Sequence, residues 1–280
     1  MKLYITATAT LLTLTSSSTY ASFCDTDDSF TQEWVEDFET FSSDRFTKIV
    51  GENVGACRSA TCLEDNVWVE DGALVMMSDR NENGNYTSGA VWTKDLVKWS
   101  TDDGPFRLCV RAILPGDDNG ADGSNQGIWP AHWLMPEDDS CDPDEGEPDI
   151  LEMINGDGTA WSTYHWMNSY PADNCTKDYD ENHKSVSHGN DIKDWSTSYH
   201  EYAVERSSDY IAFIHDGVTV VNATVDPSND AFPLLWGMPF HLILNTAIGG
   251  TWPGEPTEDT VMPIYHYIDY VKVSRKNENQ

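Results

Sequence analysis

Short apolar runs separated by turn residues make up most of the chain. Val67–Met77 and Ile211–Val221 each consist of two apolar runs joined by a central Asp-Gly pair, an arrangement typical of a tight β-hairpin. Tyr265–Val273 alternates apolar and polar positions, as a half-buried β-strand does. No long stretch has the apolar spacing of an amphipathic helix. The pattern therefore predicts a succession of short β-strands.

The distribution of these runs predicts a single domain. Two polar, acidic loops interrupt the strands, at Pro115–Gly127 and Pro136–Gly146, but neither has the composition of a linker and no segment repeats another. The length of 280 residues fits one large all-β domain. We therefore expect an all-β jelly-roll sandwich of two antiparallel sheets.

The first 21 residues have the features of a secretory signal peptide in the required order. Lys2 supplies a positive start, Leu3–Thr15 is apolar apart from its threonines, and Ser16–Ala21 offers small residues to a signal peptidase. We expect cleavage near Ala21, which leaves residues 22–280 as the domain. No later stretch is long and apolar enough for a membrane span, so we predict a secreted, extracellular protein.

All six cysteines follow the predicted cleavage position, and an even number in an exported chain predicts disulfides. Cys57 and Cys62 are close enough in sequence to clasp a local loop. Cys141 and Cys175 flank one strand region and form a candidate pair, while the remaining connectivity stays open. Three sequons are candidate N-glycosylation sites, at Asn85, Asn174 and Asn222.

The composition adds a strongly acidic surface to this picture. The chain has 48 Asp and Glu residues against 16 Lys and Arg, a formal net charge of −32. Such a surface repels phosphate backbones and anionic lipids, which argues against nucleic-acid and membrane partners. Disorder is also excluded, because 39% of the residues are hydrophobic and 11 are Trp. The aromatic residues are numerous enough to fill a core and to line a ligand cleft.

The densest candidate chemistry lies in Gly146–Met153, which contains Glu147, Asp149 and Glu152. On a regular strand Glu147 and Asp149 share a face and Glu152 points the other way. A β-bulge between Asp149 and Glu152 would place all three carboxylates on one face. The two glutamate Cα atoms would then be about 13 Å apart, and their side chains can bring the carboxyl groups to the ~5–5.5 Å of a retaining glycosidase.

A solvated acidic edge is the alternative interpretation of this segment. Ile150, Leu151 and Met153 make its flanks apolar, which favours an internal strand. Carboxylates on an internal strand are costly unless they line a cleft, so the pattern favours catalysis. Asp149 would hydrogen-bond one glutamate and help to set which of the two is protonated.

At these residues the sequence resembles glycoside hydrolase family 16, and in particular its laminarinase-like endo-β-glucanases. Glu147, Asp149 and Glu152 match the family's Glu-x-Asp-x-x-Glu signature, and Trp-rich motifs at Gly127–Pro136 and Leu242–Gly254 match in order. The resemblance implies a β-jelly-roll catalytic domain with an open cleft that hydrolyses β-1,3- or mixed-linked glucan with retention. It also implies that Glu147 is the nucleophile, Glu152 the acid/base and Asp149 an assisting carboxylate.

The resemblance extends to residues that would bind the sugar. Trp129, Trp133 and Trp252 resemble cleft tryptophans, and His165 resembles a histidine near the nucleophile. From the residues alone, the alternatives are core tryptophans and a structural histidine. His132 replaces an aromatic residue of the Trp-rich motif, which suggests an altered subsite.

The resemblance implies no required cofactor. Some members of the family hold a structural calcium ion, and Asp37, Glu39 and Asp269 occupy similar places in this chain. The histidines include no pair at zinc-ligand spacing, which argues against zinc-dependent catalysis.

Two other functions use the same fold. A transglycosylase would use the same glutamates with different acceptor subsites. A non-catalytic β-glucan-binding lectin would bind without turnover, but such relatives typically lack one or both glutamates, and this chain has both. The expected partner is a neutral β-glucan polysaccharide, bound by a monomer.

Overall fold

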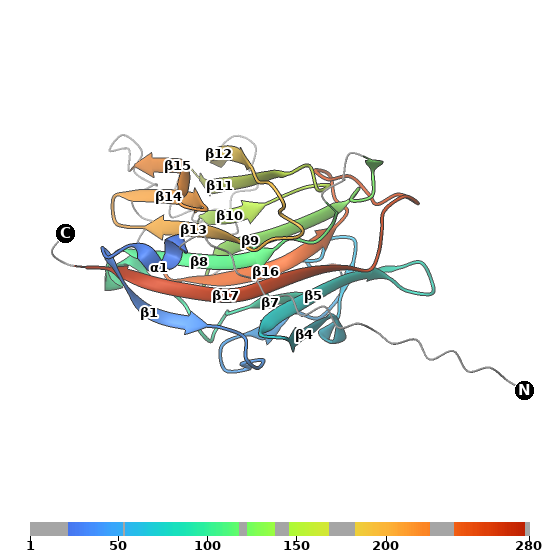
Figure 1. Ribbon diagram of the computed structural model, residues 1–280, viewed down its shortest axis with the longest axis horizontal. Coiled ribbons are helices and arrows are strands. Elements are labelled where there is room, and N and C mark those ends of the chain that lie inside the picture. The colour runs from blue at the N-terminus through green and yellow to red at the C-terminus, as the bar shows by residue number, and fades with distance from the viewer. Residues whose placement is uncertain are drawn as a thin grey trace, which may run out of the picture.

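The computed structural model describes residues 22–52, 54–117, 122–137, 146–167, 183–224 and 238–277. Figure 1 shows their strands stacked as two layers. The first sheet has the order β15-β14-β13-β8-β17-β5-β6-β3, with β1 added on β17 and β4 on β5. The second sheet has the order β12-β11-β10-β9-β16-β7-β2. The predicted sandwich of two sheets is confirmed, and its described strand pairs are antiparallel except β3 with β6.

The strands of the first sheet have the following bounds: β1 Phe30–Glu36, β3 Thr61–Cys62, β4 Val67–Glu70, β5 Ala73–Arg80, β6 Tyr86–Ser88, β8 Phe106–Ile113, β13 His200–Arg206, β14 Tyr210–His215, β15 Val218–Thr224 and β17 Ile264–Lys276. Those of the second sheet are β2 Thr47–Lys48, β7 Ala90–Trp92, β9 Ile128–Pro136, β10 Glu147–Glu152, β11 Thr159–Met167, β12 His183–Asp191 and β16 Phe240–Ile248. Short helical turns lie at α1 Phe23–Thr26, η1 Glu64–Asn66 and η2 Thr101–Asp103.

Both predicted Asp-Gly hairpins are confirmed. Asp71 and Gly72 join β4 to β5, and Asp216 and Gly217 join β14 to β15. All four residues have positive φ angles between 46° and 79°. A two-residue turn with positive φ at both positions has the twist that antiparallel strands need, and Asp-Gly adopts it readily. The local sequence therefore fixes how each pair begins at its turn, and in β14–β15 the register then shifts between Phe213 and Ile214.

The main core fills the space between the two sheets. It contains Leu108 and Val110 from β8 together with Leu242 and Leu244 from β16, all completely buried. A second cluster lies on the other face of β16, where the segment around Ala56, Cys57 and Cys62 packs against β16 residues that include Ile243. This segment explains why every residue of β16 is buried. The second sheet is thus covered on part of its outer face.

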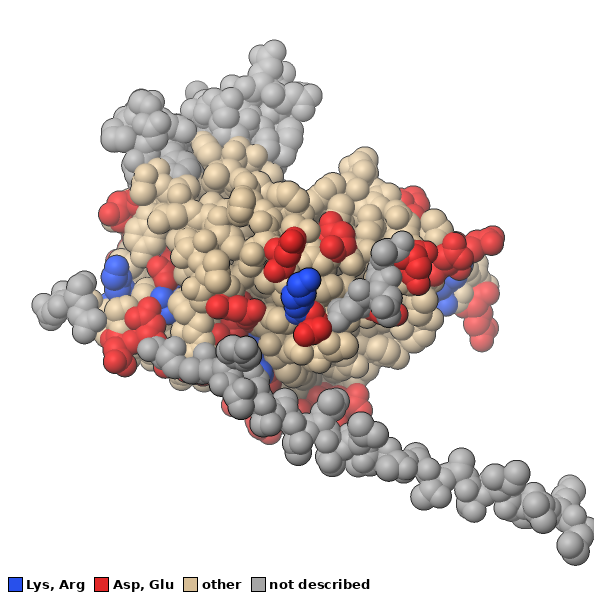
Figure 2. Space-filling model, turned by 45° about the horizontal axis from the view of Figure 1, so that its top comes forward, with Lys and Arg blue, Asp and Glu red and all other residues tan. Residues whose placement is uncertain are grey.

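Acidic side chains are spread over the face of the molecule shown in Figure 2, with few lysines and arginines among them. The charge therefore belongs to the surface of a folded domain. A sandwich with this many apolar residues between its sheets is not a disordered acidic chain.

The predicted disulfide between Cys57 and Cys62 is confirmed. A second disulfide joins Cys24 of α1 to Cys109 of β8, a pairing that the sequence left open. Cys141, Cys175, the predicted signal peptide and the sequon at Asn174 lie outside the described residues. Within the described ranges, no helix has the length and apolar composition to cross a membrane.

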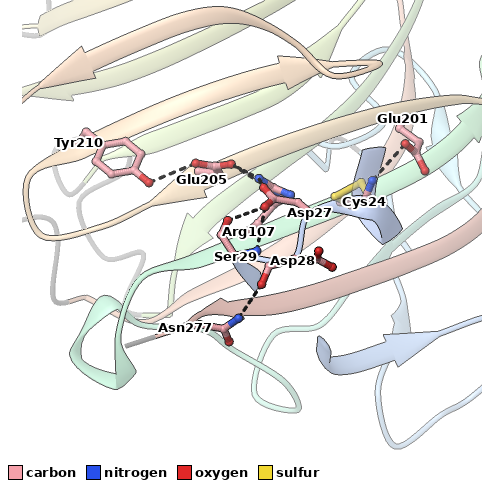
Figure 3. A network of polar contacts seen from close by, with 10 residues as sticks. Cys24, Asp27, Asp28, Ser29, Arg107, Glu201, Glu205, Tyr210 and Asn277 are labelled. Carbon is pink, nitrogen blue, oxygen red and sulfur yellow. Dashed lines mark hydrogen bonds and ion pairs between the residues drawn. A yellow bond between two sulfur atoms is a disulfide. The ribbon is translucent and has the colours of Figure 1, made fainter. Parts of the chain in front are cut away.

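The N-terminal segment is also held on the first sheet by a buried arginine (Figure 3). Arg107 lies between the rings of Phe23 and Phe30, 4.2 Å and 4.0 Å from their centroids. Its guanidinium pairs with Asp27 at 2.6 Å and donates to Glu205 at 2.9 Å. Since β8 and β13 belong to the first sheet, this network stabilises the sheet that does not carry the carboxylate segment.

Candidate active site

The three candidate carboxylates lie on one face of β10 because the strand contains a bulge. Across to β11, Glu147 pairs with His165, Asp149 with Thr163 and Glu152 with Trp161. The three partners are evenly spaced on β11, whereas an extra residue lies between Asp149 and Glu152. That extra residue returns Glu152 to the face of Glu147. The predicted bulge is confirmed.

The bulge also leaves the apolar residues of β10 in the core. Ile150 and Leu151, which lie between Asp149 and Glu152, are completely buried. Pro148 is buried as well and pairs with Tyr164 of β11. The loss of one backbone donor at Pro148 thus coexists with an intact β10–β11 register on both sides of it. The strand holds its carboxylates toward one face and its apolar side chains toward the other.

Asp149 is the most buried of the three carboxylates, with 3% of its surface exposed. Its Oδ2 lies 3.3 Å from Nε2 of His165, which comes from the adjacent strand β11. The histidine is partly exposed, so it lies at the boundary between the carboxylates and the solvent. The structure therefore brings His165 to the carboxylate group, as the sequence analysis expected, through contact with Asp149.

The surroundings of Glu152 raise the pKa of its carboxyl group. Burial raises the pKa of Glu152, while His165, the indole of Trp129 and Arg58 act in the opposite direction. The Trp129 Nε1 donates a hydrogen bond of 3.0 Å to Oε1 of Glu152. A carboxyl group with a raised pKa is suited to act as a general acid.

The predicted tryptophans lie on the carboxylate side of the second sheet, and one of them contacts Glu152. Trp129 and Trp133 lie four positions apart on β9, on the face that carries Asp149 and Glu152. Trp252 packs edge-on against Trp129, with 5.4 Å between ring centroids, and is 43% exposed. Trp129 therefore contacts a carboxylate and a second aromatic ring. The sequence singled out these tryptophans but did not indicate the hydrogen bond to Glu152.

Asn245 is a site residue that the sequence analysis missed. It lies on β16 opposite Ala131, is almost completely buried, and accepts a hydrogen bond of 2.8 Å from Nε1 of Trp133. Its own amide donates to the carbonyl of Ala56 at 2.7 Å. A single asparagine in the apolar run of β16 was the available signal, because a buried amide needs partners.

His132 does not belong to the site, contrary to the expectation of an altered subsite. It is completely buried, and its Nε2 lies 3.0 Å from Nε2 of His266 on β17 in the other sheet. Side chains alternate along a strand, so the residue between Ala131 and Trp133 must point away from the carboxylates and into the core. The histidine that replaces an aromatic residue at this position therefore alters the core and not a sugar-binding subsite.

Calcium binding by Asp37, Glu39 and Asp269 stays a prediction. Asp37 and Glu39 are exposed, and Asp269 forms an ion pair with Arg111. Among the described residues, no group of three His, Cys, Asp or Glu side chains has the arrangement of a metal site.

Comparisons with known proteins agree with this geometry. The model of the family "Glycosyl hydrolases family 16" matches residues 121–272. The "Beta-glucanase" of Rhodothermus marinus is 29% identical over 226 residues, which are 75% of this chain and 71% of that protein. The "Glucan endo-1,3-beta-glucosidase A1" of Niallia circulans is 30% identical over 232 residues, 75% of this chain but 31% of that protein.

A solved structure supports the fold. The laminarinase from Rhodothermus marinus superposes with a TM-score of 0.73 at 24% identity, covering 89% of this chain and 98% of that one. The sandwich described above is therefore a jelly roll of the laminarinase type, as predicted.

Proposed function

Because this chain belongs to glycosyl hydrolase family 16, we propose that it is a retaining endo-β-glucanase acting on β-1,3-glucan and on mixed-linkage β-1,3-1,4-glucan. The observation that carries the proposal is the bulge that puts Glu147 and Glu152 on one face of β10, with Asp149 between them. Two carboxylates on one face, flanked by tryptophans, suit double displacement at an anomeric carbon.

In the first step, Glu147 attacks the anomeric carbon of the bound glucan. The bond between that carbon and the glycosidic oxygen breaks, and the proton of Glu152 moves to the departing oxygen. A covalent glycosyl ester of Glu147 forms, and the chain end on the leaving side is released. Glu152 fits the role of acid because its pKa is raised by burial.

In the second step, the ionised Glu152 acts as a base. It takes a proton from water, the water oxygen attacks the anomeric carbon, and the ester bond to Glu147 breaks. Each step inverts the configuration of the anomeric carbon, so the two steps together retain it. Asp149 does not touch the anomeric carbon in this scheme. It orients the neighbouring groups through its contact with His165.

The proposed substrate class rests on aromatic surface and on charge. Trp129, Trp133 and Trp252 offer rings to the apolar faces of glucose units. The net charge of −32 disfavours sulfated polymers, which are polyanions. The two curated relatives described above are named for β-glucan hydrolysis, which supports a neutral β-glucan substrate for this chain.

The proposal is tested by incubating the chain with laminarin, lichenan, agar and carrageenan and measuring new reducing ends. We expect release from laminarin and lichenan, with the β-anomer formed first by proton NMR. Binding to laminarin without new reducing ends would indicate a lectin, and products longer than the substrate would indicate a transglycosylase. Release from agar or carrageenan alone would contradict the proposed substrate class.

Substitution of the glutamates tests the roles. Glu147→Gln and Glu152→Gln should each reduce turnover of laminarin by at least ~10³-fold while the circular dichroism spectrum is retained. Glu70→Gln is the matched control, because Glu70 also accepts a hydrogen bond from an indole, that of Trp68, but lies on the other sheet. Wild-type turnover in Glu147→Gln would remove this residue from the mechanism.

We also propose that the protein is exported and acts as an extracellular monomer. The disulfides Cys24–Cys109 and Cys57–Cys62 support an oxidising compartment. Export is tested by sequencing the N-terminus of the protein from culture medium, where residue 22 is expected first. Recovery of the chain only from the cytoplasm with Met1 in place would contradict it.

A further inference from the structure

A disulfide-closed loop lies on the second sheet next to the carboxylates. The backbone N–H of Ser59 donates to the carbonyl of Ile248 at 2.9 Å, and the N–H of Ile248 donates to Cys57 at 3.3 Å. The disulfide Cys57–Cys62 closes the loop, and both sulfur-bearing residues are completely buried. The loop is thus fixed at the end of β16 by its backbone and by a covalent bond.

This loop presents one charged side chain to the site. Arg58 follows Cys57 directly, has a positive φ of 54° and is exposed. Its guanidinium lies over the ring of Trp129, 5.2 Å from the centroid. The same indole packs against Trp252 and donates to Glu152 at 3.0 Å. A continuous set of contacts therefore runs from Arg58 through Trp129 to the carboxyl group of Glu152.

We propose that Arg58 is a positioning residue for the acid/base glutamate, holding the Trp129 indole in the plane from which its N–H reaches Glu152. The guanidinium acts by two means: its cation–π contact holds the Trp129 ring in place, and its positive charge acts on the carboxyl group of Glu152. This inference rests on the proposed function, in which Glu152 is the acid/base.

The charge of Arg58 also shifts the pKa of Glu152 in a predictable direction. The charged or titratable groups that face Glu152 are Glu147 and Asp149 on β10, His165 on β11, and Arg58. Arg58 and His165 favour the ionised form of Glu152, and burial opposes it. Loss of the guanidinium should therefore raise the pKa of Glu152. In a retaining glycosidase, the pKa of the acid/base sets the alkaline limb of the rate profile.

The kinetic test compares Arg58→Gln and Arg58→Lys on laminarin across pH. For Arg58→Gln we expect kcat to fall about two- to fivefold, the size of an exposed cation–π contact. We expect its alkaline limb to move upward by on the order of half a pH unit. Arg58→Lys keeps the positive charge, so the alkaline limb of its pH–rate profile should match that of the wild type. Arg80→Gln is the matched control, because Arg80 is an exposed arginine over the ring of Tyr86.

A second measurement does not depend on activity. The indole N–H resonance of Trp129, assigned by its loss in Trp129→Phe, should shift with pH as Glu152 titrates. We expect the midpoint of that titration to be higher in Arg58→Gln than in the wild type and in Arg80→Gln. An unchanged midpoint together with an unchanged alkaline limb would overturn the inference. If the wild type cleaves no glucan, the proposed function fails, while the NMR midpoint still decides the role of Arg58.

Discussion

Replacing His132 by Phe should make the stability of the protein less sensitive to acid. His132, His266 and His215 are buried in the core between the sheets, and burial lowers the pKa of each one. The values are about 3 for His266 and about 4 for His215, against 6.5 for an ordinary histidine. All three are therefore neutral in the folded protein at pH values where they are charged in the unfolded chain.

The size of the effect follows from linkage. As the pH falls below about 6.5, the unfolded chain takes up protons that the folded protein excludes, so the free energy of unfolding decreases until the folded pKa is reached. Each such histidine costs the folded state about 1.4 kcal/mol per pH unit, or about 2 kcal/mol at about pH 5. Two or three of them remove a large part of a typical stability of about 5–15 kcal/mol.

The assay is urea unfolding, followed by tryptophan fluorescence, at several values between about pH 5 and about pH 7. His132→Phe should flatten the dependence of the unfolding free energy on pH by about 1.4 kcal/mol per pH unit. At neutral pH it should cost about 1 kcal/mol, because the contact between His132 and His266 is lost. His188→Gln is the control, since His188 is exposed on β12. An unchanged slope in His132→Phe would refute the reasoning.

Two further substitutions test the site. Trp129→Phe removes the hydrogen bond to Glu152 and should lower kcat on laminarin about tenfold and raise the alkaline limb, because the indole favours ionised Glu152. A wild-type pH profile would contradict this. Cys57→Ala/Cys62→Ala frees the loop that carries Arg58, so it should reproduce the kinetic effect of Arg58→Gln and also lower Tm. A lower Tm with unchanged kinetics would show that the disulfide only stabilises the fold.

The local features of the fold could be predicted because their causes are local. An Asp-Gly pair between apolar runs has one favoured turn, so β4–β5 and β14–β15 were identified with their turn residues. The bulge in β10 followed from the spacing of Glu147, Asp149 and Glu152, since only an extra residue puts all three on one face.

The non-local features could not be predicted in this way. The disulfide Cys24–Cys109 depends on α1 lying against β8, which no local pattern specifies. The place of Arg58 depends on how its loop packs against the end of β16. His132 is a different case, because its position between Ala131 and Trp133 already implied a core side chain. The resemblance to the family led us to expect His132 in a sugar-binding subsite, although the alternation of side chains along the strand already placed it in the core.

The charges around β10 also indicate which glutamate starts the reaction protonated. Three carboxylates on one face of a chain with a net charge of −32 cannot all be ionised without strong mutual repulsion. Asp149 has a cationic partner available in His165, which favours its ionised form when the histidine is charged. Glu152 is the carboxyl group whose pKa burial raises, which favours its protonated form. The proposed mechanism gives the nucleophilic role to Glu147 on the same face. The bulge brings both glutamates to one face, and the raised pKa of Glu152 is consistent with its proposed role as the acid.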